Sequence, residues 1–398
     1  MPAASPGRWV AQGCDRLNFQ LMRIKKIFKL ALKIFLPLIF IFVCLECLMI
    51  VFDPYLFKGF YEYDPDLGFR VRPYSPNFDG TLTNQFGFNA RDYPLQKTPG
   101  VFRILVIGDS FNWAGGREGN YTALLEHMFE RRDGGHKTDI INAGYPMTHT
   151  GEELAMLKKY GLQYNPDMVV LGFFMGNDFV DADPDRKRIV VNGIYMDISR
   201  RTELKLLGYP IIPQSRLLLF MEQKYRVYRE AKKAARDNQT QPTQPGTFAE
   251  DTYLDIERGR LEFFNLSYLR DGRFQPKIDY ILQSIAEMDA LLKSRNIKLV
   301  LAVYPDEFQI NEKVLQAVVD KYKLRRENYD LNPGQSILKP FLDSKGIPFV
   351  DFTNRFRAEG KKQDLYLLRD THWNAAGNQL AADILFEDLG QRLGSVNR

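Results

Sequence analysis

Short apolar runs alternate with helical patterns from residue 103 to the end of the chain, and this alternation constrains the fold more than any other feature. Such runs are typical of strands that are buried on both faces of a parallel sheet. We expect strands at 104–107, 139–142, 168–174, 298–304 and 348–351. We expect helices at 120–132, 152–164, 278–295 and 375–392. The predicted fold class is therefore α/β, a doubly wound, mostly parallel five-stranded sheet with helices on both faces.

An apolar stretch near the amino terminus predicts a membrane anchor. Residues 34–52 contain a single ionisable residue, Glu46, and are long enough to span a bilayer. Arg and Lys dominate the residues before this stretch, so the positive-inside rule places the amino terminus in the cytoplasm and everything after residue 52 outside it. The long basic leader favours an uncleaved anchor over a cleaved signal peptide or a buried core helix. Glu46 either contacts a membrane partner or reaches interfacial water.

The excess positive charge of the chain and all of its cysteines lie in this amino-terminal part. The formal net charge is +5, and the excess of basic residues lies in the leader, so no basic surface remains that would predict a nucleic-acid partner. All three cysteines, Cys14, Cys44 and Cys47, precede residue 53. The rest of the chain therefore has no disulfide, thiolate metal site or cysteine nucleophile, and we expect neither a metal nor a diffusible cofactor.

Four segments are predicted along the chain. They are a cytoplasmic basic leader at 1–33, the anchor at 34–52, an extended extracytoplasmic segment at 53–100 that packs on the following domain, and an α/β domain at 101–398. An insertion at about 179–277 interrupts the α/β pattern. It contains a hairpin signal at Asn192-Gly193, a basic helical stretch at 214–236 and a polar, proline-bearing stretch at 237–246 that we expect to be disordered. The insertion is either a lid or partner surface over the active-site end of the sheet, or a solvated excursion.

Two candidate site residues follow strands of the predicted sheet. Ser110 stands in a Gly-Asp-Ser turn after the first strand, where it either caps a helix or acts as a nucleophile. Asn177 follows the third strand, where its amide either stabilises an oxyanion or makes a local Asx turn. The carboxyl ends of parallel strands meet at one edge of the sheet, so we expect these residues to face each other.

Two further loops reach the same edge. The loop at 142–147 follows the second strand and can offer a backbone N–H; its Gly144 otherwise is a turn glycine, and the nearby His149 is a surface or helix-start histidine. His372 precedes the last helix and has Asp370 two positions before it, which suits a general base and its orienting partner, although an Asp cap with a neighbouring histidine is the simpler interpretation. A calcium loop at 181–185 is excluded because Arg186 stands where such a loop needs glycine.

These four blocks resemble the SGNH or GDSL hydrolase family. The matching letters are "GDS" at 108–110, "NAGYPM" at 142–147, "GND" at 176–178 and "DTHWN" at 370–374, in the family's order. The resemblance implies that Ser110 is the nucleophile, His372 the base and Asp370 the orienting acid. It also makes Asn177 an oxyanion donor, together with backbone N–H groups of Ser110 and of the 142–147 loop, where Gly144 and Met147 are the candidates.

The chain departs from the family pattern at three positions. The family commonly has its acid three residues before the histidine, where this chain has Arg369; the spacing of Asp370 resembles the "DTHW" of alginate O-acetyltransferase relatives, which place that block before their serine. Met175 and Met147 stand where the third and second blocks usually have glycine.

The resemblance leads to a functional hypothesis. We expect a single-pass membrane protein whose extracytoplasmic domain, periplasmic in a Gram-negative cell, is a serine-dependent ester hydrolase or acyl (acetyl) transferase acting on O-acyl groups of a glycan. The alternatives are an esterase of lysophospholipids or other lipids, and a non-catalytic subunit that works with a membrane acyltransferase. The expected partners are the bilayer and a glycan or acyl-ester substrate, and the sequence does not separate hydrolysis from transfer.

Overall fold

The computed structural model describes residues 7–56, 59–133, 137–191, 193–197, 205–206, 209–210, 215–237 and 247–396. Its centre is a five-stranded sheet in the order β11-β10-β5-β3-β4, and every neighbouring pair is parallel. The strands are β3 (Phe102–Ile107), β4 (Thr138–Asn142), β5 (Met168–Phe174), β10 (Lys298–Tyr304) and β11 (Phe349–Asp351). The predicted fold class is confirmed, and each expected strand lies within two residues of an observed one.

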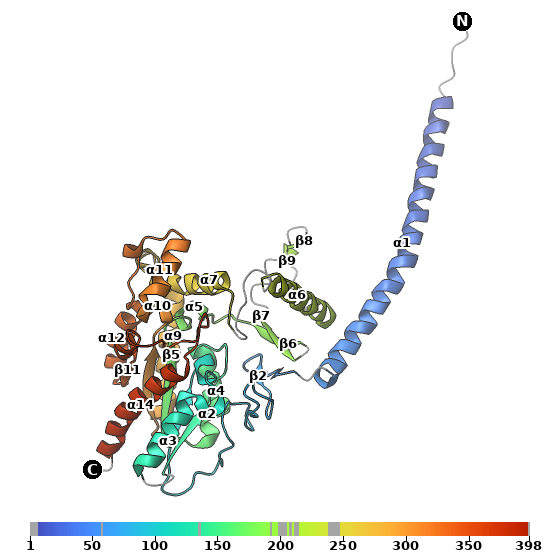
Figure 1. Ribbon diagram of the computed structural model, residues 1–398. Helices are drawn as coiled ribbons and strands as arrows, with labels where there is room; N and C mark the ends of the chain where they lie inside the picture. Colours follow the sequence, from blue (N-terminus) through green and yellow to red (C-terminus); the bar gives the residue numbers. More distant parts are fainter. Residues whose placement is uncertain are drawn as a thin grey trace.

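Helices cover both faces of this sheet (Figure 1). Successive residues of a strand point to opposite faces, and in β3 Leu105 and Ile107 enter one hydrophobic cluster while Ile104 and Val106 enter the other. The first cluster contains residues of α4 (Thr150–Lys159), α9 (Gln275–Lys293), α11 (Glu312–Lys321) and α12 (Pro333–Lys345). The second contains residues of α3 (Tyr121–Asp133), α13 (Thr353–Glu359) and α14 (Ala375–Val396). Burial on both faces explains why the strands are continuous apolar runs.

The strand order has its topological switch point between two identified strands. In chain order the sheet reads second, first, third, fourth, fifth, the flavodoxin-like arrangement, in which the connections from the first and third strands leave in opposite directions. The first and third strands are β3 and β5, which pair with Ile107 opposite Leu171. Residues that follow these two strands therefore border the position where doubly wound folds bind ligands.

The segment before the sheet packs on the main domain, with β1 (Tyr61–Glu62) and β2 (Arg70–Val71) forming a small antiparallel pair. Phe69 and Phe88 are buried, and Phe88 belongs to the larger core cluster. Asn89 Nδ2 donates hydrogen bonds to the carbonyl oxygens of Asn112 and Gly116. The segment thus contributes buried polar contacts directly behind the turn that carries Ser110.

The predicted insertion divides into two parts. The first contains α5 (Asp178–Asp181), the hairpin of β6 (Arg188–Val191) and β7 (Ile194–Asp197), the short pair β8 (Lys205–Leu206) and β9 (Tyr209–Pro210), and α6 (Arg216–Asp237). The second contains α7 (Glu250–Leu261), the 3-10 turn η4 (Glu262–Phe264) and α8 (Leu266–Arg270), and it buries Phe263 and Phe264 in the larger core cluster. The second part therefore contributes apolar side chains to the core. Asn192 and residues 238–246, which include most of the stretch predicted to be disordered, lie outside the described residues.

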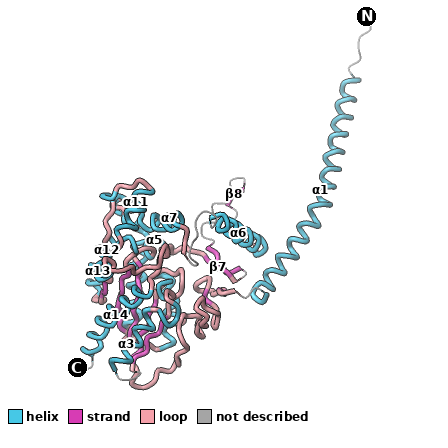
Figure 2. Tube along the Cα trace, viewed as in Figure 1, coloured by secondary structure: helices cyan, strands magenta, loops and turns pink. Residues whose placement is uncertain are grey.

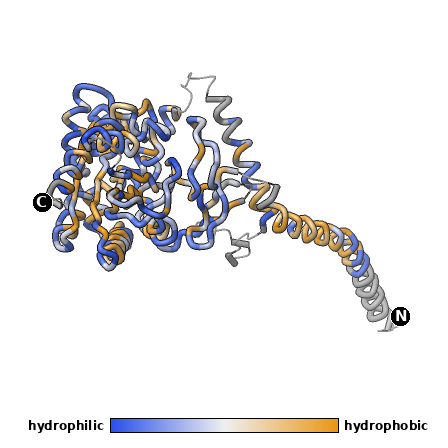
Figure 3. Tube along the Cα trace, turned by 90° about the horizontal axis from the view of Figure 1, so that it is seen from below, coloured by the Kyte–Doolittle hydropathy of each residue, from blue (hydrophilic) through white to orange (hydrophobic). Residues whose placement is uncertain are grey.

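Helix α1 (Gly7–Leu56) projects away from the rest of the molecule (Figure 2). Its residues Lys25–Phe52 are long and apolar enough to cross a membrane, and none of this span is buried by the protein. Figure 3 shows the hydrophobic part of α1 next to the body of the protein. The remaining short elements are η1 (Ser110–Asn112), α2 (Gly116–Gly119), η2 (Gly161–Tyr164), α10 (Glu307–Ile310) and η5 (Arg326–Asn328).

Candidate active site

Ser110 begins the short helical turn η1 directly after β3. The side chain that caps this turn belongs to Asp109, whose Oδ1 accepts a hydrogen bond from the N–H of Phe111 at 3.0 Å. The sequence left open whether Ser110 is a cap, and the structure assigns that contact to its neighbour. The Ser110 hydroxyl is therefore available for another partner.

His372 contacts Ser110 from the base of a tight hairpin. Tyr366 and Trp373 form an antiparallel bridge, and the N–H of Leu367 donates to the carbonyl of His372. Trp373 is fully buried and packs edge-on against Phe111 at 4.7 Å between ring centroids. Because neighbouring residues of an extended segment point in opposite directions, the buried Trp373 fixes the outward direction of His372.

The structure brings Ser110, His372 and Asp370 into one hydrogen-bonded chain. His372 Nδ1 lies 2.7 Å from Asp370 Oδ1, and His372 Nε2 lies 2.8 Å from Ser110 Oγ. An ionised carboxylate can only accept, so the proton of the neutral imidazole sits on Nδ1 and leaves Nε2 as the acceptor for the serine hydroxyl. Burial raises the pKa of Asp370, but the hydrogen bonds and charge of His372 outweigh it and hold that pKa below its usual value. This geometry suits general-base activation of Ser110.

The conformation of the hairpin tip explains why the acid can stand two residues before His372, with Arg369 at the family's usual position for it. Arg369 adopts a left-handed backbone conformation with φ 50°, and the N–H of Asp370 donates to the carbonyl of Leu367. This tight turn folds Asp370 back, so that its Oδ1 accepts from the backbone N–H of His372 as well as contacting the ring. A carboxylate two positions before the histidine therefore reaches the imidazole without help from the residue at Arg369.

Asn177 follows β5 and contacts the turn that follows β3, as the switch between these two strands predicts. Its Nδ2 donates to Asp109 Oδ2 at 3.2 Å, so the amide nitrogen rather than the oxygen faces the Ser110 turn. The second N–H of this amide is left for another acceptor. Asp109 therefore both caps the serine turn and orients the amide of Asn177.

The loop after β4 contributes differently from the prediction. The N–H of Gly144 donates to Asn142 Oδ1 at 3.2 Å, so the geometry does not support Gly144 as an oxyanion donor. Gly144 has a packing role instead, because a Cβ there would lie 2.3 Å from the Cβ of Asn112. Met147 has φ 68°, the left-handed region in which glycine is favoured, and this is the position that aligns with the family's glycine. The backbone at Met147 thus keeps a glycine-like conformation despite its side chain.

Three buried carboxyl groups beneath the site were not predicted. Asp109, Glu153 and Asp178 are all at least 97% buried, and burial raises the pKa of each, most strongly for Glu153 and Asp178. Their mutual repulsion adds to that effect for Glu153 and Asp178. Asp178 Oδ2 accepts from the N–H of Phe174 at 2.7 Å, which ties the end of β5 to the Asn177 turn. The letters "GDS" and "GND" contained Asp109 and Asp178, but nothing in the sequence indicated that both are buried.

His149 is not a surface residue, which corrects one of the two interpretations of its position. It is almost fully buried and is the N-cap residue of α4, where its Nδ1 accepts a hydrogen bond from the N–H of Gly151 at 3.2 Å. Burial, followed by the nearby Arg186 and Arg188, lowers the pKa of His149 to about 3. It is therefore a neutral helix cap and not a second base.

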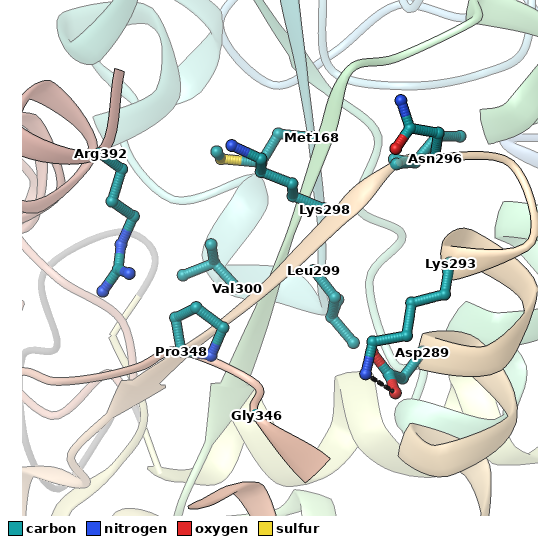
Figure 4. A pocket seen from close by; sticks show the side chains of 11 residues that line it. Met168, Asp289, Lys293, Asn296, Lys298, Leu299, Val300, Gly346, Pro348 and Arg392 are labelled. Atoms are coloured by element: carbon teal, nitrogen blue, oxygen red, sulfur yellow. Dashed lines mark hydrogen bonds and ion pairs between the residues drawn. The ribbon is translucent and has the colours of Figure 1, made fainter. Parts of the chain in front are cut away.

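A separate pocket lies at the opposite edge of the sheet (Figure 4). It has a volume of about 420 Å³ and is lined by the first residues of β5 and β10, Met168 and Lys298, together with residues such as Asp289, Lys293 and Arg392. None of the predicted site residues lines it. No group of His, Cys, Asp and Glu that could hold a metal ion occurs within the part of the chain that the structure describes.

One family model matches the carboxyl-terminal part of the chain. The model described as the SGNH hydrolase-like domain of acetyltransferase AlgX matches residues 263–396. Residues 263–396 are thus similar to an SGNH hydrolase-like domain. The matched part of the chain includes Asp370 and His372, whereas Ser110 and Asn177 lie before it.

Several solved structures are similar to the chain, and no curated protein matches it. An acetyl xylan esterase, AlAXEase, is 17% identical, with 72% of this chain and 100% of that chain covered and a TM-score of 0.38. The lipase/acylhydrolase from Enterococcus faecalis is 13% identical over 73% of this chain and 97% of that chain, with a TM-score of 0.38. The psychrotrophic esterase EstA from Pseudoalteromonas sp. is 12% identical over 73% and 98%, with a TM-score of 0.35.

Proposed function

We propose that this protein is a membrane-anchored serine esterase or acyltransferase that acts on O-acyl groups, in the first place O-acetyl groups, of an extracytoplasmic glycan. The single observation that carries the proposal is the hydrogen-bonded chain from Asp370 through His372 to Ser110. The AlgX match supports acetyl as the acyl group. The apolar helix α1 and the basic leader support the extracytoplasmic location.

The proposed reaction begins when Ser110 Oγ attacks the ester carbonyl carbon and His372 Nε2 takes the hydroxyl proton. The carbonyl oxygen becomes an oxyanion, for which the free N–H of Asn177 and the backbone N–H of Ser110 are the proposed donors. His372 then gives its proton to the departing alcohol oxygen as the tetrahedral intermediate collapses to an acyl-serine. Asp370 stabilises the imidazolium that exists between these two transfers.

The second half of the reaction returns the enzyme to its starting state. His372 removes a proton from water or from a sugar hydroxyl, and the resulting nucleophile attacks the acyl-serine carbonyl. Release of the acid, or of the acylated sugar, restores the Ser110 hydroxyl. Whether water or sugar attacks depends on how well the crevice excludes water.

The test is a panel of acetyl esters, short- and long-chain acyl esters and a lysophospholipid, each assayed with and without an oligosaccharide acceptor. An acetylated polysaccharide is assayed as a further substrate. We expect turnover of acetyl esters to exceed that of long-chain esters, and an O-acetylated oligosaccharide product or acetate release from the polysaccharide. Ser110→Ala should abolish both. A preference for lysophospholipid over every acetyl ester would contradict the glycan proposal and favour a lipid esterase.

A further inference from the structure

Glu46, the acid within the apolar span, contacts helix α6 of the same chain. Its carboxylate accepts hydrogen bonds from Ser215 Oγ at 2.5 Å and from the backbone N–H groups of Arg216 and Leu217 at 2.6 and 3.0 Å. Glu46 lies six residues before the last residue of the span, Phe52, which is about 9 Å along a helix axis. The amino terminus of α6 is therefore attached to α1 close to the outer end of the span.

The first turn of α6 makes its hydrogen bonds without solvent. The N–H groups of Arg216 and Leu217 donate to Glu46, that of Leu218 donates to Ser215 Oγ at 3.2 Å, and that of Leu219 donates to the carbonyl of Ser215 at 3.0 Å. The first N–H groups of a helix otherwise depend on water or on caps. Such a helix start is suited to the water-poor boundary of a bilayer, where unsatisfied backbone groups are costly.

One face of α6 is packed and the opposite face is apolar and exposed. Leu219 and Gln223 are buried on the packed face, where Leu219 contacts Met196 of β7. The opposite stripe has the helical spacing three, four, three, and each of its residues is between 43% and 63% exposed. This stripe, which we call the α6 stripe, consists of Leu218, Met221, Tyr225 and Tyr228.

Exposed cations border the α6 stripe. At 100° per residue, Lys224 and Arg229 fall on its two sides, and Lys232 continues it by one turn. Basic residues outnumber acidic ones in the sequence of α6 as a whole. Tyrosines at the apolar edge and flanking Lys and Arg are the composition of helices that lie in the membrane interface and bind anionic lipid.

We propose that α6 is an interfacial helix, which lies on the outer surface of the bilayer beside the anchor, with the α6 stripe in the headgroup region and its cations on anionic phospholipids. The attachment at Glu46 supplies the continuity with the membrane span, and the cations supply the charge complementarity. The consequence is that the anchored domain is held against the bilayer at two points, α1 and α6, and not on a single flexible tether. This proposal rests on insertion of α1 and is independent of the catalytic proposal.

The test places a nitrobenzoxadiazole probe on single cysteines of the full chain, after Cys14, Cys44 and Cys47 have been replaced by Ser. Tyr225→Cys and Tyr228→Cys report on the α6 stripe. Val227→Cys is the matched control, because Val227 is also apolar, 49% exposed and on the same helix, but faces away from the stripe. A chain that keeps only Cys47 reports on insertion of α1. Each protein is reconstituted in vesicles of phosphatidylcholine with or without phosphatidylglycerol, containing lipids with a nitroxide in the headgroup region or on the acyl chain.

We expect probes at 225 and 228 to be quenched by headgroup and shallow-chain nitroxides, and the probe at 227 to stay in water. The quenching should increase with the content of phosphatidylglycerol. Replacing Lys224, Arg229 and Lys232 by Gln should lower the affinity of α6 for these anionic vesicles by roughly fivefold per cation. Equal quenching at 225 and 227 would overturn the proposal. Blue-shifted but unquenched emission of the probe at 225 would mean that protein, and not lipid, covers the α6 stripe. An unquenched probe at Cys47 would mean that α1 is not inserted in the bilayer. Either result contradicts the proposal.

Discussion

Asp370 is the residue whose assignment depended most on geometry. Its spacing from His372 departs from the usual family pattern, yet its Oδ1 lies 2.7 Å from His372 Nδ1. We predict that Asp370→Asn lowers kcat for an acetyl ester by roughly 10³- to 10⁴-fold, since the amide no longer holds the required tautomer or stabilises the imidazolium. The matched control is Asp364→Asn, an exposed acid two residues before Tyr366 of the same hairpin. Similar rates for Asp370→Asn and Asp364→Asn would contradict the assignment.

His149 gives a prediction about stability and pH. The pKa of His149 is about 3 in the folded protein, against an ordinary value of 6.5 for histidine, so the unfolded chain binds a proton that the folded chain does not. Stability linked to His149 is therefore present above pH 6.5 and is lost as the pH falls from 6.5 toward 3. At pH 5.5 the loss is about 1.4 kcal/mol in the free energy of unfolding.

The variant His149→Asn isolates this contribution, because Asn is a good helix cap that does not titrate. Thermal unfolding of the detergent-solubilised chain at pH 7.5 and 5.5 should show a smaller acid-induced loss for the variant than for the wild type. The buried acids Asp109, Glu153 and Asp178 have raised pKa values and act in the opposite direction, but they are common to both proteins. Identical pH dependence of the two proteins would show that folding does not lower the pKa of His149.

At the scale of elements, the turn after β5 depends on Gly176. A Cβ at Gly176 would lie 2.1 Å from Oδ2 of the buried Asp306 and 2.5 Å from the ring of Phe174. We predict that Gly176→Ala destabilises the protein by about 1–3 kcal/mol through overpacking and lowers kcat by moving Asn177. Gly119→Ala is the control, since nothing lies within 4 Å of its Cβ position. Equal melting temperatures and rates for both variants would show that the turn is not tightly constrained.

The same scale shows what could be predicted from the sequence. The strands β3, β5 and β10 were predictable because burial on both faces makes them continuous apolar runs, and the parallel order then brings Ser110 and Asn177 to one edge. The helix α7 and the core residues Phe263 and Phe264 were assigned to a surface insertion. The long interruption of the strand–helix alternation gave no sign that the chain packs into the core again before α9. Local pattern records which residues are apolar but not where a distant segment packs.

Some of the site residues could also be predicted from the sequence, and others could not. Ser110 and His372 were predictable from the local motifs, which the structure brings to a contact of 2.8 Å. The cap by Asp109 and the use of the Gly144 N–H by Asn142 were not, because both depend on how neighbouring loops meet. The capping of α6 by Glu46 joins residues 169–171 positions apart, and no local signal indicates such a pair.

At the scale of the whole molecule, the protein combines an apolar helix that can cross a membrane with an α/β domain whose candidate site lies at the carboxyl edge of its sheet. Asn89 of the connecting segment donates to the carbonyl of Asn112 in the Ser110 turn, so this segment is part of the site's support. The connecting segment and the candidate site are thus joined by buried hydrogen bonds.

The central claim is that Ser110 is a nucleophile activated by His372. The most direct measurement is the covalent labelling of the full-length protein by a fluorophosphonate, followed by intact mass and peptide mapping, for the wild type, Ser110→Ala and His372→Ala. We predict one adduct on Ser110 in the wild type, none on Ser110→Ala, and labelling of His372→Ala that is slower by roughly 10³-fold or more. A wild-type protein that stays unlabelled, or one that is labelled equally well without Ser110 or His372, would contradict the claim.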